Sequence, residues 1–193
     1  MNTIVKSSSG IALVPAESRL LTDRKVFIRS EINSETAYNF ITSIMLLVKE
    51  DPERPIDIYI IDSPGGEVNA GLLIYDTIKG LDTVVNMHCV GMAASMAAIL
   101  MAGGQKGRRF IMPRSKMMIH EPLLSGGIGG SATTIQRTAE SIMETKRILV
   151  DLLANDTGKS KDEVEKAIAY DNYMNAEEAI AFGLCDSIEK SIV

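Results

Sequence analysis

A single hydroxyl, that of Ser95, interrupts a run of small and apolar side chains in the segment GMAASMAAIL at residues 91–100. A serine in such a run is either a small core residue that bonds a carbonyl one turn back, the commoner case, or a nucleophile at the first turn of a helix. Attack on a carbonyl carbon requires a base, because a serine hydroxyl is a weak nucleophile at its own pKa. The choice between the two interpretations therefore depends on whether a base can reach Ser95.

The chain contains only two histidines, His88 and His120. His88 precedes Ser95 by seven residues on the same predicted strand. At about 3.3 Å per residue this extended path covers roughly 20 Å, so only a sharp reversal would bring the two together. His120 ends another predicted strand, at the rim of a sheet, and is the predicted base. Spacing alone leaves open a second role for it, as a histidine bonded to a loop carbonyl beside Pro122.

A catalytic triad also needs a carboxylate that orients the imidazole and stabilises its charged form. Asp171, in the segment AYDNYMNAEEA, is flanked by apolar and aromatic residues rather than by a run of charges. We therefore expect Asp171 to be partly enclosed, in contrast to Asp151, Asp162 and Glu163.

The oxyanion formed by serine attack needs backbone N–H donors. The Gly65–Gly66 pair follows a predicted strand and precedes a predicted helix, and glycines expose such donors without side-chain interference. The helix that begins at Ser95–Met96 supplies another donor and a favourable dipole. A plain turn is the commoner role of a Pro-Gly-Gly sequence.

Other chemistries find no support in the sequence motifs. The G-x-S-x-G elbow is absent around Ser95. The segment TGKS at 157–160 resembles the end of a phosphate loop, but the position of its first glycine holds Leu153 and no strand precedes it. Neither H-E-x-x-H nor paired C-x-x-C spacing offers a zinc site. We expect no cofactor and no metal.

Periodic apolar patterns predict an α/β fold with a largely parallel sheet in one domain, residues 1–193. Residues 1–22 read as a loosely or conditionally ordered arm, and SPGG at 63–66 reads as a turn. In the helix capped by Asn33 or Ser34, the apolar positions include Met45. The predicted strands are 25–30, 56–61, 83–90, 109–112, 117–120 and about 185–188; the predicted helices are about 34–48, 68–79, a helix from Ser95, 132–156, 161–169 and 175–182.

The composition is that of a soluble globular protein, with 46% hydrophobic and 23% charged residues and a net charge of −5. This charge gives no support for nucleic-acid or anionic-membrane binding, both of which favour a basic face. The apolar stretch 89–104 is too short and too rich in Ala and Gly for a membrane span. We read no signal peptide, and Cys89 and Cys185 lie in apolar runs, so we expect reduced buried thiols in a cytoplasmic protein.

Four segments carry a resemblance to a known family: DSPGGEVNAGLLIYDTI, CVGMAASMAAILMAGG, KGRRFIMPRSKMMIHEPL and AEEAIAFGLCDSI, in this order. From about Ser18 to Ile188 the chain resembles ClpP, the proteolytic subunit of the Clp protease. The resemblance implies a crotonase-like fold, a spiral of β-β-α units, with a protruding helix-containing handle at about 122–156 through which two rings meet. It matches Ser95 to the nucleophile, His120 to the base and Asp171 to the acid. It matches the backbone N–H groups of Gly66 and Met96 to the oxyanion hole.

The same resemblance implies a serine endopeptidase that degrades unfolded polypeptides by acyl-enzyme chemistry. Family members form two stacked heptameric rings around the active sites, and a Clp-type AAA+ unfoldase, which uses the ATP, feeds them. One alternative is an acyl-CoA hydratase or isomerase on the same fold, although hydratases need no triad. Another is a non-catalytic or regulatory ring subunit that pairs with a catalytic paralogue.

Several positions depart from the usual family pattern. Glu121 follows the base where a glutamine is usual, and Tyr170 precedes the acid where an arginine is common. Ile58, Ile60 and Gly80 stand where aromatic residues typically line the unfoldase docking groove. The glycine-rich stretch within LLSGGIGG is longer than usual, and the arm keeps only SRLL at 18–21. These departures predict intact chemistry and an altered docking surface.

Overall fold

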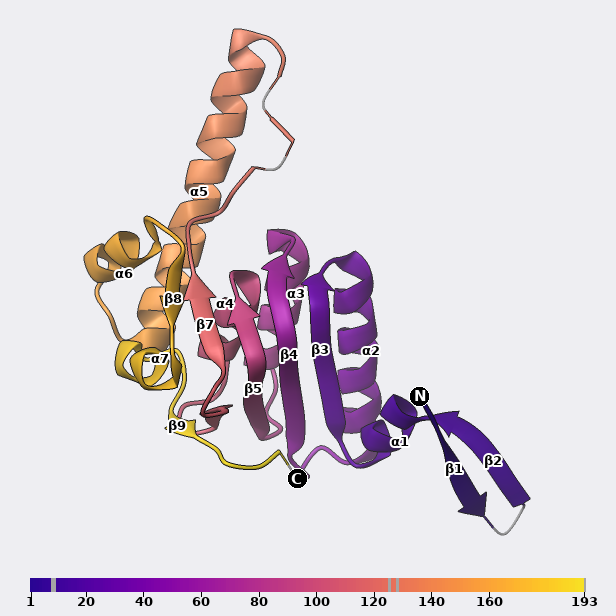
Figure 1. The fold of residues 1–193 in the computed structure, drawn as a ribbon. Coiled ribbons are helices and arrows are strands. Elements are labelled where there is room, and N and C mark those ends of the chain that lie inside the picture. The colour runs from indigo at the N-terminus through magenta and orange to yellow at the C-terminus, as the bar shows by residue number, and fades with distance from the viewer. Residues whose placement is uncertain (8–9, 125, 128, 193) are drawn as a thin grey trace.

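The computed structural model describes residues 1–7, 10–124, 126–127 and 129–192. Strands and helices alternate along most of the chain (Figure 1), as the apolar periodicity predicts. The strands are β1 Asn2–Ser7, β2 Gly10–Pro15, β3 Lys25–Ile32, β4 Ile56–Gly66, β5 Val85–Ala94, β6 Arg109–Ile111, β7 Lys116–Ile119, β8 Asn172–Met174 and β9 Ser187–Ile188. The helices are α1 Ala16–Thr22, α2 Ser34–Glu50, α3 Val68–Lys79, α4 Met96–Gly103, α5 Ala132–Thr157, α6 Lys161–Ile168 and α7 Ala176–Phe182.

The central sheet runs in the order β3-β4-β5-β6-β9, and all of these neighbours pair in parallel. Strand β5 has two partners in succession on the same side: residues 87–89 pair with β6, and residues 92–94 pair with β7. Strand β8, which the sequence did not predict, pairs antiparallel with β7. The mainly parallel α/β architecture is thus confirmed, and the branch at β5 creates the sheet edge that carries the candidate site.

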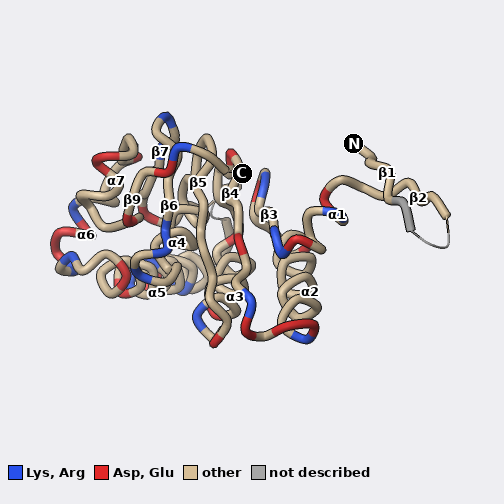
Figure 2. The backbone as a smooth tube through the Cα atoms, turned by 90° about the horizontal axis from the view of Figure 1, so that it is seen from below, with Lys and Arg blue, Asp and Glu red and all other residues tan. Residues whose placement is uncertain are grey.

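Helices α2, α3 and α4 lie on one face of the sheet (Figures 1 and 2), and α4 contacts β4, β5 and α3. Asn33 caps α2 by accepting a hydrogen bond from the Thr36 amide, as predicted. The buried face of α2 includes Leu47, whereas Met45 is 65% exposed, so the assignment of Met45 to the core face was wrong. Every residue of α4 is buried, and its small residues, the alanines and Gly103, let it lie close to the strands.

The SPGG segment is extended and forms the end of β4 rather than a turn. The register joins Ser63 to Ala93 on β5 and Gly66 to Ile32 on β3. Gly65 and Gly66 have φ values of +89° and +151°, which glycine adopts without strain. A Cβ at Gly66 would lie 2.1 Å from the Ile32 carbonyl oxygen, because β3 approaches the Gly66 backbone closely. Pairing with β3 thus prevails over the turn propensity of Pro-Gly-Gly.

The long helix α5 extends well beyond the body of the molecule (Figure 1). Only its C-terminal half is anchored, through Leu149, Val150 and Leu153. In the N-terminal half, Ile135 is 43% exposed. Ser125 and Ile128, in the glycine-rich stretch before α5, lie outside the described residues. That this stretch is longer than usual for the family therefore stays a prediction.

The N-terminal arm has regular structure. β1 and β2 form an antiparallel hairpin that projects away from the body, and the short helix α1 leads from it to β3 (Figures 1 and 2). The arm was predicted as loosely ordered; helix α1 buries no residue, which explains why its pattern gave no helical signal. Ser8 and Ser9, between β1 and β2 in the sequence, lie outside the described residues.

Lys and Arg are interspersed with Asp and Glu around the helices (Figure 2). Within the described part of the chain, no helix is both long enough and apolar enough to cross a membrane. Cys89 and Cys185 are buried free thiols, as predicted, and burial raises the pKa of each to about 12.

Candidate active site

Ser95 occupies the junction between β5 and α4. Its amide donates to the carbonyl of Met118 on β7 at 2.8 Å, so the sheet holds the backbone of the nucleophile candidate directly. Ser95 has φ +55° and ψ −125°, a conformation in which non-glycine residues are strained. This sharp turn lifts the hydroxyl out of the buried run on either side of it. The side chain is not a core serine bonded back to its own helix.

His120 connects the hydroxyl to a carboxylate. Its Nε2 lies 2.9 Å from Ser95 Oγ, and its Nδ1 lies 3.1 Å from Asp171 Oδ1. With the proton on Nδ1, the ring donates to Asp171 and can accept the hydroxyl proton of Ser95. The three residues that sequence reasoning selected therefore form one hydrogen-bonded chain.

Asp171 is more open than we expected. Its side chain is 63% exposed, whereas that of His120 is only 16% exposed. Tyr170 and Tyr173, which suggested an enclosed segment, are themselves 64% and 56% exposed. The expectation of an enclosed acid was therefore wrong for the single chain, because these aromatic side chains point to solvent.

The glycine pair lies against the nucleophile. A Cβ built on Gly65 would lie 2.7 Å from Ser95 Cβ and 2.9 Å from the Met96 nitrogen. Met96 is the first residue of α4, and the first amides of a helix have no acceptor within it. The strand end at Gly65–Gly66 and the start of α4 thus meet beside Ser95, where an oxyanion would need donors.

His88 lies in a different cluster, as its distance along the strand predicted. Its Nδ1 contacts both carboxylate oxygens of Glu189 at 2.9 Å, and its Nε2 lies 3.7 Å from Asp57. The ring stacks between Tyr59 and Phe110. Burial alone would lower the pKa of His88, but the two carboxylates outweigh it and the pKa is raised.

A groove of about 650 Å³ lies beside the triad. Glu67 and Val68, which follow the glycine pair, form one wall, and Pro122 and Leu123, which follow His120, belong to the same lining. The handle helix contributes residues that include Ile142. The groove lies between the residues that follow the glycine pair and the handle helix, and no triad residue lines it.

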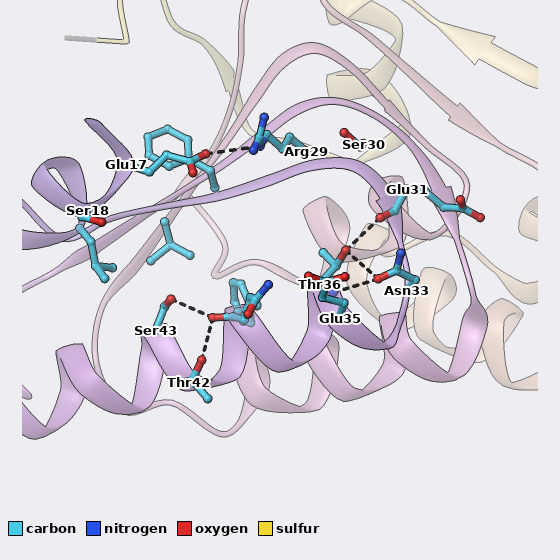
Figure 3. Close-up of a pocket in the computed structure, with 15 residues that line it drawn as sticks. Glu17, Ser18, Arg29, Ser30, Glu31, Asn33, Glu35, Thr36, Thr42 and Ser43 are labelled. Carbon is cyan, nitrogen blue, oxygen red and sulfur yellow. Dashed lines mark hydrogen bonds and ion pairs between the residues drawn. The ribbon is translucent and has the colours of Figure 1, made fainter. Parts of the chain in front are cut away.

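A second cavity, of about 620 Å³, lies between α1, β3 and α2 (Figure 3). Glu17 and Arg29 form an ion pair at its edge, and Asn33 and Thr36 line its polar end. No triad residue lines it, and it holds no group suited to the chemistry of Ser95. Among the described residues, no cluster of three His, Cys, Asp or Glu side chains could hold a metal.

Four of the residues that depart from the family pattern have the following places in the structure. Ile58 and Ile60 are fully buried in the core, so the expectation that they line a docking groove was wrong; Tyr59, between them, faces the opposite side of the sheet. Gly80 ends α3. Glu121 forms an ion pair with Lys146 on α5, a partner that sequence reasoning missed because no local spacing links the two residues.

Comparison with known proteins agrees with this geometry. The family model described as Clp protease matches residues 9–191. The chain belongs to the Clp protease family. It is 47% identical over 174 residues to the ATP-dependent Clp protease proteolytic subunit 2 of Chlamydia trachomatis serovar D, covering 90% of this chain and 84% of that protein. The protein of the same name from Chlamydia muridarum is 46% identical over the same shares.

Membership of the Clp protease family fixes the fold and the class of enzyme. The mixed α/β sheet with its protruding helix is the Clp protease fold, and the chain is a Clp-type protease subunit. The serine, the histidine and the aspartate that the resemblance matched are the residues that the structure brings into contact.

Proposed function

We propose that the chain is a serine endopeptidase that cleaves unfolded polypeptides through an acyl-enzyme. The observation that carries the proposal is the contact of one imidazole with both Ser95 Oγ, at 2.9 Å, and Asp171 Oδ1, at 3.1 Å. These are hydrogen-bonding distances for a nucleophile, a base and an orienting acid.

In this mechanism His120 Nε2 takes the hydroxyl proton as Ser95 Oγ attacks the scissile carbonyl carbon. Asp171 stabilises the imidazolium through its contact with Nδ1. The backbone N–H groups of Gly66 and Met96 are the proposed donors to the oxyanion. His120 then gives its proton to the leaving amine, and a water molecule, activated by the same base, hydrolyses the ester.

Confinement in a double ring of heptamers is part of the same proposal. Apolar side chains that a monomer would leave in water support it: Met45 and Tyr38 on α2 and Met143 on the handle are each more than 60% exposed. A separate AAA+ unfoldase would supply unfolded chains and use the ATP, and the peptidase chemistry itself needs no cofactor. Native mass measurement of the assembly, with and without candidate unfoldases, tests this part.

The catalytic assignment is tested with a fluorophosphonate probe and a small fluorogenic peptide. We expect the probe to modify Ser95 alone, and Ser95→Ala and His120→Ala to lose about 10⁴-fold or more in turnover. Asp171→Asn should lose less, because water screens its exposed carboxylate. Ser43→Ala is the matched control, since that hydroxyl bonds its own helix at Asn39. Full peptidase activity in Ser95→Ala would refute the assignment.

A ring subunit that supports a catalytic paralogue is the second candidate. The relatives are named proteolytic subunit 2, a numbered name that is compatible with more than one kind of subunit in those organisms. The contacts of Ser95 with His120 favour a catalytic role even in a mixed ring. Mixing the chain with a paralogue, with the nucleophile removed from one subunit at a time, separates the two cases: a supporting subunit keeps full ring activity without Ser95.

A further inference from the structure

The residue after the proposed base is held from two directions. The Glu121 amide donates to the carbonyl of Ile168, at the end of α6, at 2.9 Å. Its carboxylate lies 2.6 Å from the ammonium of Lys146 on α5. The backbone next to His120 is therefore tied to α6 by its amide and to α5 by its side chain.

Lys146 lies at the base of the handle. The residues before it on α5 are largely exposed, as Met143 is at 62%, whereas Leu149, Val150 and Leu153 after it are buried. The Lys146 side chain is 26% exposed and that of Glu121 is 43% exposed, so the pair is more sheltered than a surface ion pair. The contact joins the segment that follows β7 to α5.

We propose that Glu121 is a positioning residue that fastens the His120 segment to the base of the handle helix through its ion pair with Lys146. This proposal rests on the proposed peptidase function, because it assigns the role by way of the base. Movement of α5 at its base would then be passed to His120. Pro122 and Leu123, which follow at once and line the groove, would move with them.

The charges of the pair have a second consequence. His120 faces Asp171 from the segment before β8 and Ser95 from the start of α4, while Glu121 and Lys146 approach from its own segment and from α5. The two charges of the pair have opposite sign. Removing one partner leaves the other unbalanced, so the two removals act on the imidazole with opposite sign.

The test measures the pH dependence of kcat/KM for Glu121→Gln and Lys146→Met in the full assembled chain. Glu121→Gln leaves an unbalanced ammonium and shifts the acid limb to lower pH, and Lys146→Met leaves an unbalanced carboxylate and shifts it to higher pH. Each shift should be roughly 0.3–0.5 pH unit, as for a unit charge about 8 Å away in a water-like medium. The shifts should shrink at high salt.

The positioning role is read from kcat. Each single substitution should lower kcat by roughly threefold to tenfold, because a loosened segment holds the base less well. Exchange of the two charges, Glu121→Lys with Lys146→Glu, should restore most of the loss, and Lys146→Arg should behave as the native chain. The control is the exposed pair Glu144–Arg147 on the same helix, also 2.6 Å long, whose removal should change neither kcat nor the pH profile.

The two histidines permit a readout that needs no turnover. In protein labelled with ¹³C-histidine, His88→Gln assigns the ring signals, and the titration of the His120 signal should shift in opposite directions in the two single variants. If the native chain neither cleaves peptide nor labels at Ser95, the peptidase proposal fails while this titration still decides the role of the pair. Shifts of the same sign, no shift, or an unchanged kcat in an active enzyme would overturn the positioning role.

Discussion

The backbone of Ser95 stores strain that a glycine would release. At φ +55° and ψ −125° a residue with a Cβ carries a cost of about 1–3 kcal/mol. Ser95→Ala keeps the Cβ and Ser95→Gly removes it, while both remove the hydroxyl and its contact with His120. The difference between the two variants therefore isolates the backbone from the loss of the hydrogen bond.

The expected size follows from three effects. Relief of strain favours glycine by about 1–3 kcal/mol, while the greater freedom of glycine in the unfolded chain costs about 0.5–1 kcal/mol. Loss of a half-buried methyl costs roughly another 0.4 kcal/mol. The exchange of Ala for Gly at position 95 should therefore lie between about 0.4 kcal/mol destabilising and about 2 kcal/mol stabilising.

Ala98 supplies the matched control. It lies one turn into α4, is fully buried and is helical, so Ala98→Gly gains no relief and should destabilise by about 1–2 kcal/mol. Made in the Ser95→Ala background, the two exchanges should differ by about 2 kcal/mol. Urea unfolding followed by far-ultraviolet circular dichroism, at a fixed protomer concentration, would show this as a midpoint shift of about 1 M. Equal losses at the two positions would refute the strain argument.

Two further predictions concern charges away from the triad. Arg109 is 1% exposed and donates to both carboxylate oxygens of Asp186, so Asp186→Ala leaves a buried cation and should cost about 3 kcal/mol in urea unfolding; a loss below about 1 kcal/mol would show that other acceptors suffice. Because the pKa of His88 is raised in the fold, its contribution to stability is full below the unfolded value of about 6.5 and is lost as pH rises through the folded value. The free energy of unfolding, measured across this pH range, should fall as the pH rises, and Glu189→Gln should flatten this dependence. An unchanged slope in that variant would contradict the role of the carboxylate.

The sequence predicted most strands of the central sheet, most helices and the three triad residues, but it missed β8 and the regular structure of the arm. Ser95 and His120 followed from a small inventory of histidines, and Asp171 followed from a resemblance that spans most of the chain. The face to which a side chain points was harder to infer. Ile58 and Ile60 belong to a continuous apolar run in a parallel strand, where neither face shows a polar alternation that would mark it.

Tertiary pairing accounts for the other differences. The Pro-Gly-Gly sequence has turn propensity, yet Gly66 is held extended because β3 pairs with it at Ile32. Strand β8 is only three residues long and exists because β7 offers it an edge. The tie from Glu121 to Lys146 joins residues 25 positions apart, and no motif records such a distance.

Each triad residue directly adjoins the end of a strand of the central sheet. Ala94, next to Ser95, is paired with Met118, and Ile119, next to His120, is paired with Asn172, next to Asp171. Strand β7 belongs to both of these ladders, so its pairing with β5 and with β8 sets the positions of the three backbones while the strands stay paired. If the sheet is preserved, we expect an inactive state of this enzyme to arise from rotation of a side chain. The imidazole of His120, which contacts both Ser95 and Asp171, is the side chain that we expect to rotate.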